Sequence, residues 1–185
     1  GWGYNLGAIF QVSPSTRLGA AYRSKVKYNV TGDVTSNRPV SGSATANAIM
    51  AGATPNGPIK LDIELPDVAT FSVHQKLSDQ WEMMGDVSWT GWAKIPRLSI
   101  FRTNGALLSN TEENWRNTVR VAFGGAYKYS DALKLRMGVA YDQTPVEDDF
   151  RTPRLPDSDR YWLAFGGQYK VSAAGAIDFG YTHVF

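Results

Sequence analysis

The chain has 185 residues, a length that suits one domain or part of a larger one. Its 19 basic and 17 acidic residues leave a net charge of +2, which is too balanced to indicate nucleic-acid binding. The lack of cysteine excludes a disulfide framework and thiolate metal sites, and no apolar run reaches the roughly 18 residues of a transmembrane helix. The sequence starts at Gly1 without a signal peptide, so we expect a fragment of a longer protein.

Alternation of apolar with small or polar residues is the dominant pattern, and it recurs in eight segments. In the first, Trp2, Tyr4 and Leu6 alternate with Gly3 and Asn5. In chain order, the predicted strands span residues 2–12, 17–30, 70–77, 81–90, 119–129, 133–142, 161–171 and 177–185. Helical periodicity is almost absent, so the pattern predicts an all-β, antiparallel structure.

The connections between these strands have two lengths, which alternate along the chain. Tight turns with the sequences SPST, SDQ, SDA and AAG join the strands in pairs. The other connections are long and span residues 31–67, 95–114 and 143–158. Short turns at one end and long loops at the other are typical of outer-membrane barrels, in which the turns face the periplasm.

Alternation does not show which face is wet, so a soluble barrel of the lipocalin type is the alternative. Most of the 6 Trp, 9 Tyr and 8 Phe residues lie on the apolar face. The interior of an eight-stranded barrel is only just wide enough for its own side chains, so this many rings would hardly fit inside. We therefore predict an antiparallel transmembrane β-barrel whose apolar face contacts lipid.

Strand direction predicts where the chain ends lie. The last segment leaves a short turn and runs toward the loop side, which places Phe185 near the outer rim. Bacterial barrels have an even number of strands, and an open strand edge has no partner in lipid. We therefore expect residues 1–185 to be one partial β-barrel domain with further strands on both sides.

The polar face of the predicted strands carries more positive than negative charge. Four carboxylates, Glu82, Asp86, Asp142 and Asp178, accompany ten cations: Arg17, Arg23, Lys25, Lys27, Lys76, Arg120, Lys128, Lys134, Arg136 and Lys170. Such a surplus in a narrow lumen attracts an anionic head group, which makes Arg23, Lys25, Arg120 and Arg136 candidate ligand-binding residues. Salt bridging to the carboxylates is the alternative, and cations beside the turns would simply face periplasmic water.

Two long connections contain further candidates. In RTPRLPDSDRYW, Arg154 and Arg160 lie near two prolines and two aspartates, either in a stiff loop that presents arginine to an anionic ligand or in an ordinary loop with paired arginines. In ATANAIMAGATP, Ile49 and Met50 interrupt polar loop sequence. They would either capture an alkyl chain at the cell surface or pack the loop against its neighbours.

Catalytic machinery is not evident. His74 and His183, the two histidines, lie on distant predicted strands. Ser72 and His74 lie about 7 Å apart on one strand, without a third group to orient them. No phosphate loop, metal cluster or nucleotide motif occurs, so we predict neither an enzyme nor a cofactor or metal site.

Specific motifs occur within residues 2–34, 65–92 and 115–170: YRSK at Tyr22–Lys25, DQTPV at Asp142–Val146 and PRLPDSDRYW at Pro153–Trp162. In these stretches the chain resembles the long-chain fatty acid outer-membrane transport family, which also includes aromatic-hydrocarbon uptake channels. The resemblance covers nearly the whole chain.

The resemblance implies a fourteen-stranded monomeric barrel in the outer membrane of a Gram-negative bacterium, plugged by an N-terminal hatch. The eight segments would be strands six to thirteen, and the hatch, the early strands and the last strand would lie outside this sequence. The implied function is passive uptake of long-chain fatty acids or similar hydrophobic compounds, with membrane lipid as a partner and no nucleic acid. Aromatic-hydrocarbon uptake is the alternative within the family, and a soluble lipid-binding barrel is the alternative outside it.

Overall fold

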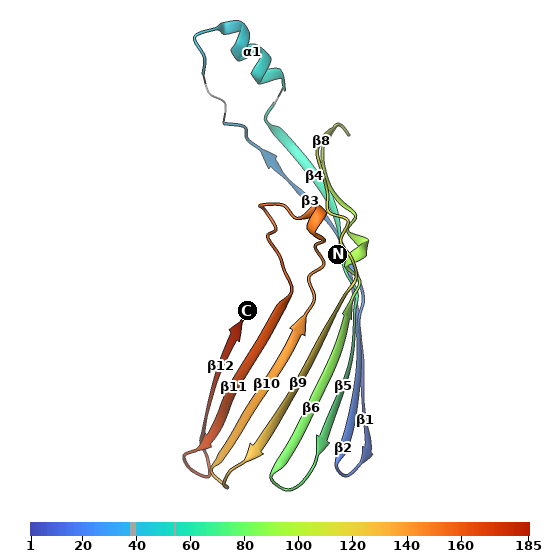
Figure 1. Ribbon diagram of the computed structural model, residues 1–185. Helices are drawn as coiled ribbons and strands as arrows, with labels where there is room; N and C mark the ends of the chain where they lie inside the picture. Colours follow the sequence, from blue (N-terminus) through green and yellow to red (C-terminus); the bar gives the residue numbers. More distant parts are fainter. Residues whose placement is uncertain (38–39, 54) are drawn as a thin grey trace.

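The computed structural model describes residues 1–37, 40–53 and 55–185. Its main element is an open antiparallel sheet of eight strands, here called the wall, with the order β1-β2-β5-β6-β9-β10-β11-β12 (Figure 1). The strands are β1 (Asn5–Ser13), β2 (Thr16–Arg23), β5 (Val68–Lys76), β6 (Trp81–Thr90), β9 (Thr118–Lys128), β10 (Leu133–Asp142), β11 (Arg160–Lys170) and β12 (Ala176–Val184). The predicted antiparallel all-β architecture is confirmed.

The short turns at the lower end of the wall share a hydrogen-bonding scheme based on serine. In the turn between β9 and β10, Ser130 Oγ accepts hydrogen bonds from the amides of Ala132 (3.3 Å) and Leu133 (3.0 Å). Ser78 and Ser172 accept amide hydrogen bonds in the same way in two other turns. A short hydroxyl side chain satisfies amides that the strand ladder leaves free, which favours serine in these turns.

Cross-strand register divides the wall into two faces. Asp86 stands directly opposite Ser72 on one side and Ala122 on the other, so these three side chains share a face. One residue along, Val87 stands opposite Phe71 and Val121 on the other face. Because side chains alternate between faces, the apolar and the small or polar residues separate as the sequence predicts.

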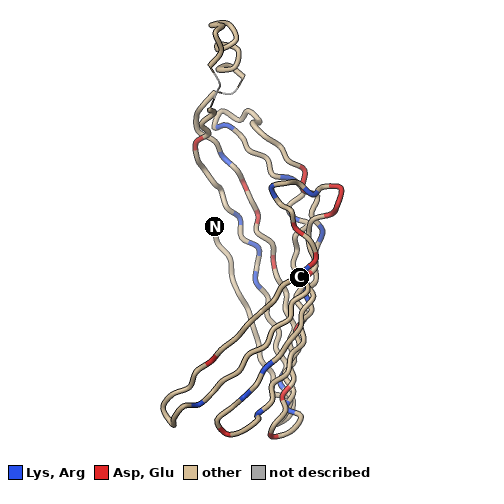
Figure 2. Tube along the Cα trace, turned by 60° about the vertical axis from the view of Figure 1, so that its left-hand side comes forward, with Lys and Arg blue, Asp and Glu red and all other residues tan. Residues whose placement is uncertain are grey.

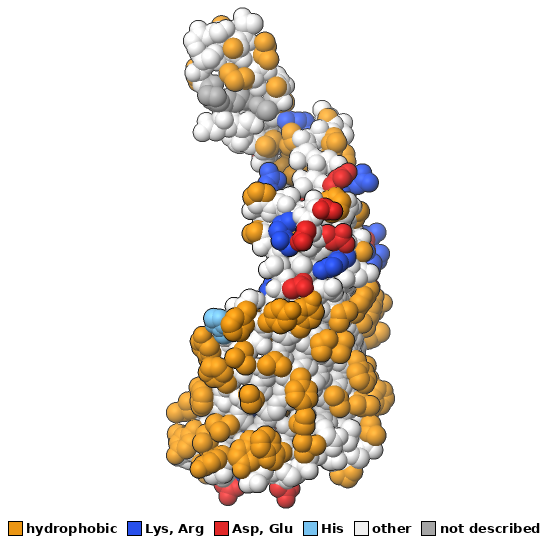
Figure 3. All heavy atoms as spheres, viewed as in Figure 1, with side chains coloured by type: hydrophobic (Ala, Val, Ile, Leu, Met, Phe, Trp, Pro, Cys, Tyr) orange, Lys and Arg blue, Asp and Glu red, His pale blue; other side chains and the backbone are white. Residues whose placement is uncertain are grey.

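The apolar face of the wall is uncovered over a wide area (Figure 3). Phe71, Phe123 and Phe165 are 54%, 52% and 51% exposed. Soluble proteins rarely leave so large an apolar patch in water, whereas a barrel wall presents one to lipid. Aromatic pairs lie near both ends of the strands, with ring centroids 4.5 Å apart for Trp81 and Tyr127 and 5.2 Å apart for Tyr141 and Tyr161.

Above the wall the chain forms a second antiparallel sheet, here called the upper sheet, with the order β3-β4-β7-β8 (Figure 1). Its strands are β3 (Val26–Val34), β4 (Gly57–Leu65), β7 (Arg97–Arg102) and β8 (Leu107–Glu112). β3 and β4 pair along their whole length, whereas β4 and β7 share only the pairs from residues 59–61 to 100–102.

The upper sheet corrects the prediction of one strand over residues 17–30. β2 ends at Arg23, and the chain breaks at Ser24, whose amide donates to the Tyr4 carbonyl oxygen (2.9 Å) while its Oγ accepts from the Tyr4 amide (2.9 Å). β3 then leaves the wall and pairs with β4. The alternation continues through the break because β3 is also a strand, so its period does not reveal the change of partner.

The long connections 31–67 and 95–114 are also more ordered than predicted, since they contain β4, β7 and β8. β4 carries a readable signal, with Ile59, Leu61 and Ile63 alternating with Lys60 and Asp62. The third connection contains a short helical turn, η2 (Asp148–Phe150). The alternation in β4 therefore indicates a strand within a stretch that the prediction assigned to a loop.

Helix α1 (Ala44–Ala53) lies at the tip of the β3–β4 hairpin, where the sequence predicted a loop (Figure 1). Ser43 caps it by accepting the Ala46 amide (3.3 Å), and its alanines have the highest helix propensity. Of the predicted apolar stretch 44–55, Thr54 lies outside the described residues. None of the helices in the described part of the chain is long and apolar enough to cross a membrane.

Most buried side chains lie between the wall and the upper sheet, in a layer here called the rim. It comprises Ser24, Asp67, residues 91–96 with the helical turn η1 (Trp92–Lys94), residues 113–118 and residues 143–159. Side chains of the rim that are almost fully buried are those of Ile95, Glu113, Thr118, Thr144 and Val146. The rim is therefore the packed part of the molecule, and it lies at the loop end of the wall.

Asp67 links the rim to the wall. Its carboxylate accepts hydrogen bonds from the Tyr22 hydroxyl (3.1 Å) and from Lys94, and its carbonyl oxygen accepts the Gly91 amide (3.0 Å). The hydrogen bond from Lys94 outweighs burial and holds the pKa of Asp67 below its usual value. A side chain at position 91 would collide with this carboxylate, because a Cβ there would lie 2.5 Å from Asp67 Oδ1.

The last residue, Phe185, lies at the loop end of the wall, as strand direction predicted (Figure 1). Its amide donates to the carbonyl oxygen of Tyr161, at the start of β11 (2.9 Å). The N-terminus lies at the same end (Figure 1).

Candidate functional site

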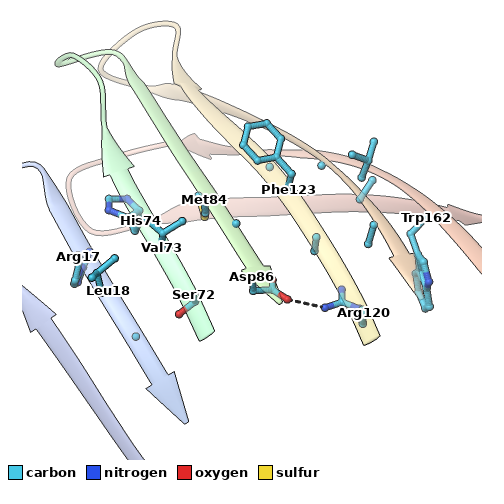
Figure 4. Close-up of a pocket in the computed structure, with 18 of the residues that line it drawn as sticks. Arg17, Leu18, Ser72, Val73, His74, Met84, Asp86, Arg120, Phe123 and Trp162 are labelled. Atoms are coloured by element: carbon cyan, nitrogen blue, oxygen red, sulfur yellow. Dashed lines mark hydrogen bonds and ion pairs between the residues drawn. The ribbon is translucent and has the colours of Figure 1, made fainter. Parts of the chain in front are cut away.

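The small and polar face of the wall is concave. Residues from all eight strands line one hollow of about 640 Å³ on this face, here called the lower hollow (Figure 4). A hollow shared by every strand requires the sheet to curve around it. The charged or polar side chains that line it are Arg17, Ser72, His74, Asp86, Arg120 and Thr182.

Small residues make room for the lower hollow. Met84 stands opposite Gly124, and the same row continues to Gly138 and Ala164 on the next strands. A Cβ on Gly124 would lie 3.0 Å from the Met137 carbonyl oxygen, so the backbones of β9 and β10 approach closely there. The concave face therefore has room for a large ligand, whereas the convex face carries aromatic side chains.

A second hollow of about 530 Å³, here called the upper hollow, lies where the rim covers the loop end of the wall. Its floor consists of side chains from wall strands, including Ser88, Thr118 and Arg120. The rim supplies the rest of the lining with Trp92, Trp115, Gln143, Pro145, Val146, Arg154, Leu155, Pro156 and Asp157. The third long connection therefore folds over the concave side of the wall.

Hydrogen bonds to two aspartates hold this connection in place. Asp159 accepts the Tyr141 hydroxyl (2.6 Å) and the Thr144 amide (2.8 Å). Asp157 accepts the Thr144 hydroxyl (2.7 Å) and pairs with Arg160, which also contacts Asp142 (3.1 Å). The loop is thus tied at both ends to the outer ends of β10 and β11.

The same contacts set the charge state of both aspartates. The hydrogen bonds from Tyr141 and Thr144 hold the pKa of Asp159 below its usual value. Burial raises the pKa of Asp157, but the hydrogen bonds from Thr144 and Arg160 outweigh it, so that the net shift is downward. Both groups are therefore charged acceptors at neutral pH.

Arg120 lines both hollows and so lies at their boundary. Its Nη1 donates to Asp86 Oδ2 at 3.1 Å (Figure 4), and the two side chains remain 41% and 34% exposed. Further charged residues lie in the rim, in the upper sheet, in the short turns and along the lower part of the wall strands (Figure 2). Arg120 is thus the predicted ligand-binding residue that the structure places most centrally.

Most other predicted cations have partners within the chain. The pairs are Arg23 with Asn5 (3.3 Å), Lys25 with Glu64 (2.9 Å), Arg136 with Asp178 (3.3 Å), and Arg160 with Asp142 and Asp157. The expected position of Lys25 on the wall is corrected, because it lies at the break between β2 and β3. Lys27 likewise leaves the wall with β3 and pairs with Glu64 (3.4 Å).

The side chains of two arginines that line the hollows form no hydrogen bond or ion pair within the described part of the chain. Arg154 lines the upper hollow, and Arg17 lines the lower hollow near the β1–β2 turn. For Arg17, which lies beside a short turn, the sequence leaves open a role in the lumen or contact with periplasmic water. Unpaired guanidinium groups on the concave face are suited to bind a carboxylate.

The two candidates Ile49 and Met50 belong to α1, which lies at the tip of the β3–β4 hairpin, away from the wall (Figure 1). Ile49 is 68% exposed, and neither Ile49 nor Met50 lines the lower or the upper hollow. Ile49 and Met50 therefore do not belong to either hollow.

Sequence reasoning assigned no role to three tryptophans that line the hollows. Trp92 and Trp115 meet edge to face in the upper hollow, with ring centroids 5.3 Å apart. Trp162 faces the lower hollow from β11, opposite Ala140. Small or polar residues otherwise occupy the lumen side of β11, so a tryptophan on that side could have marked Trp162 as a candidate ligand contact.

A curved antiparallel sheet that is apolar outside, small and charged inside, and joined by short turns at one end defines part of an outer-membrane β-barrel. The comparisons agree with this class. Residues 1–185 match a sequence model of the family described as "Outer membrane protein transport protein (OMPP1/FadL/TodX)". The chain belongs to this family.

Two curated relatives illustrate the similarity. The chain is 31% identical over 189 residues to the long-chain fatty acid transport protein of Escherichia coli O6:H1, and the alignment covers 100% of this chain and 42% of the relative. It is 31% identical over 188 residues to the 47 kDa outer membrane protein of Pasteurella multocida, and that alignment covers 100% of this chain and 43% of the relative. The chain thus spans less than half the length of these relatives.

Solved structures show the same relation. A Pseudomonas aeruginosa FadL homologue superposes with a TM-score of 0.86 at 27% identity, over 99% of this chain and 44% of the homologue. The Pseudomonas putida toluene transporter TodX shares the fold, with a TM-score of 0.66 at 19% identity over 98% of this chain and 43% of TodX. The predicted family and outer-membrane location are confirmed, and a lipocalin-like barrel finds no support. The family itself is one of transport proteins.

Proposed function

We propose that the protein takes up long-chain fatty acids or similar hydrophobic compounds across the outer membrane, along the concave face of the wall. The observation that supports this most directly is the pair of hollows that meet at Arg120, with the unpaired Arg154 in the outer one. Passive uptake needs such a series of sites, each strong enough to admit the substrate and weak enough to release it.

The upper hollow suits an amphipathic anion. The Arg154 guanidinium would bind the carboxylate, while Trp92, Trp115 and Leu155 offer apolar surface to the first part of the alkyl chain. Because the loop is tied by Asp157 and Asp159, Arg154 is held over the hollow without being neutralised by either. The fatty acid relative from Escherichia coli agrees with this substrate class.

Residues around the hollows would also take part in uptake. Ile49 and Met50 on α1 would make the first contact with an alkyl chain outside the cell. Arg23, Lys25, Arg136 and Arg160 would act on a ligand only by exchanging their present partners. The apolar convex face would contact membrane lipid, and the protein would act as a monomer.

Uptake of neutral aromatic hydrocarbons is a second candidate, and one observation favours it. Several cations of the concave face are paired, including Arg120 with Asp86 and Lys134 with Glu82 (2.8 Å), so little unpaired positive charge remains for a carboxylate. Trp162 adds an aromatic surface to the lower hollow.

Uptake by cells that make the full-length protein, in a host without its own fatty acid uptake protein, tests the proposal. We expect Arg154→Ala to raise the oleate concentration that gives half-maximal uptake about tenfold, the effect of losing one charge-assisted hydrogen bond. Arg151→Ala is the matched control, because Arg151 lies in the same loop, pairs with Asp148 (2.7 Å) and lines neither hollow.

If Arg154→Ala and Arg151→Ala transported oleate alike, the carboxylate site would be wrong. Toluene uptake without oleate uptake in the unmodified protein would favour the hydrocarbon candidate.

A further inference from the structure

The ion pair between the two hollows has the properties of an exchangeable contact. Arg120 and Asp86 share a single hydrogen bond of 3.1 Å, and both side chains are partly exposed. A partly solvated pair with one contact contributes little stability, so a competing carboxylate can replace Asp86 at low cost. Asp86 lines only the lower hollow, whereas Arg120 lines both.

Another carboxylate close to Arg120 is already engaged. Asp142 stands directly opposite Arg120 in the β9–β10 register, but its side chain pairs with Arg160 (3.1 Å). Arg160 is itself held by Asp157. Asp86 is therefore the residue that competes with an incoming anion for Arg120.

Strand register orders the groups along the lumen. Arg120 is level with Ala21 of β2 through the pairs Arg120↔Ser88, Ser88↔Thr70 and Thr70↔Ala21. Arg17 lies four residues before Ala21 in β2, roughly 13 Å closer to the short turns. Asp86 is level with Gly19 through Ser72, midway between the two arginines. From the rim inward, the order is Arg154, Arg120, Asp86 and Arg17.

We infer that Asp86 is a built-in competitor that makes Arg120 a transfer point. A substrate carboxylate would take the place of Asp86 on Arg120 and be displaced when Asp86 rebinds, so that the anion moves on to the level of Arg17. This inference rests on the proposed function and deepens it, because it selects amphiphiles with one anionic head group. Without Asp86, the bare guanidinium in a confined site would bind the carboxylate tightly and release it slowly.

The Asp86→Asn variant of the full-length protein tests the inference. We expect it to bind oleate about tenfold tighter in lipid nanodiscs, because the internal competitor for one charge-assisted hydrogen bond is lost. We also expect cellular uptake of saturating oleate to fall severalfold, while binding and uptake of neutral oleyl alcohol stay unchanged. Asp148→Asn is the control, since it breaks an aspartate–arginine pair that lies outside both hollows.

Asp86→Glu, which keeps the carboxylate, should restore oleate uptake, and Asp86→Ser serves as a second neutral variant if Asp86→Asn does not reach the membrane. The inference is overturned if a neutral variant binds and transports oleate like the unmodified protein, or if oleate and oleyl alcohol change equally. Failure of the unmodified protein to take up oleate at all would instead overturn the proposed function.

Discussion

The wall and the rim are stabilised in different ways. In the described residues of the wall, Ala126 and Gly167 lie buried within the strands and Thr118 is buried where β9 meets the rim, whereas the other side chains of the wall are partly or fully exposed. The rim contains most of the other buried residues, among them Ile95, Glu113 and Val146. The wall therefore depends on backbone pairing and on the lipid around it, whereas the rim depends on its own side-chain contacts.

A charge on the lipid face should show the largest difference between the two regions. Met137 lies on the convex face in the middle of β10 and is 65% exposed. We expect Met137→Arg to lower the free energy of unfolding in lipid vesicles by about 2–4 kcal/mol, the cost of an arginine near the bilayer centre. Urea titration of the full-length protein measures this change.

Leu107→Arg is the control for that prediction, because Leu107 is 58% exposed but lies in the upper sheet. There an arginine faces water, and we expect a change within about 0.5 kcal/mol. Equal effects at the two positions would contradict the assignment of the convex face to lipid.

Removal of a buried side-chain contact should act mainly on the rim. Asp67→Ala leaves the Tyr22 hydroxyl and the Lys94 ammonium without their shared acceptor. We expect local protection of residues 91–96 from hydrogen exchange to fall by about 1–3 kcal/mol, with the strands of the wall unchanged. Asp131→Ala removes an exposed turn pair with Lys128 (2.5 Å) and should leave both regions as they are.

Acid should produce a smaller change, confined to residues 143–159. The lowered pKa values of Asp157 and Asp159 mean that their contribution is present above the usual value of 3.8 and is lost as pH falls through the lower folded-state values. We expect the loop to resist pepsin from pH 5 down to the folded-state pKa values of Asp157 and Asp159, and to be cut at lower pH. The doubly substituted Asp157→Asn, Asp159→Asn protein should be cut already at pH 5, and protection of that variant would contradict the role of the two aspartates.

The sequence predicted the wall well and the upper sheet poorly for one physical reason. Alternation is a local property of a strand, so it identified the eight wall strands and their lipid side without knowledge of their partners. The same property hid the end of β2, because the pattern continues into β3 while the pairing partner changes. β4 was missed although its alternation is equally regular, because it lies in a stretch already assigned to a loop.

The candidate site was predictable only in part. Arg120 and Arg154 were identified as cations suited to an anionic ligand, and both line hollows on the concave side. The sequence could not show that the Arg120 side chain is paired and the Arg154 side chain is not. Arg120 pairs with Asp86, which lies 34 residues away in the sequence, whereas Arg154 does not pair with the aspartates that follow it in the chain. The role of the tryptophans in lining the hollows likewise depends on how the rim folds over the wall.

By itself, the sequence determined the strands, their two faces, the short turns and the family motifs, since each depends on residues close together in the chain. Tertiary structure alone decided that β3 leaves the wall, that residues 143–159 fold over the lumen, and that Arg17 and Arg154 stay unpaired while Arg120 does not. Ion pairing depends on which side chains meet after folding, and cross-strand partners such as Glu82 and Lys134 lie 52 residues apart in sequence.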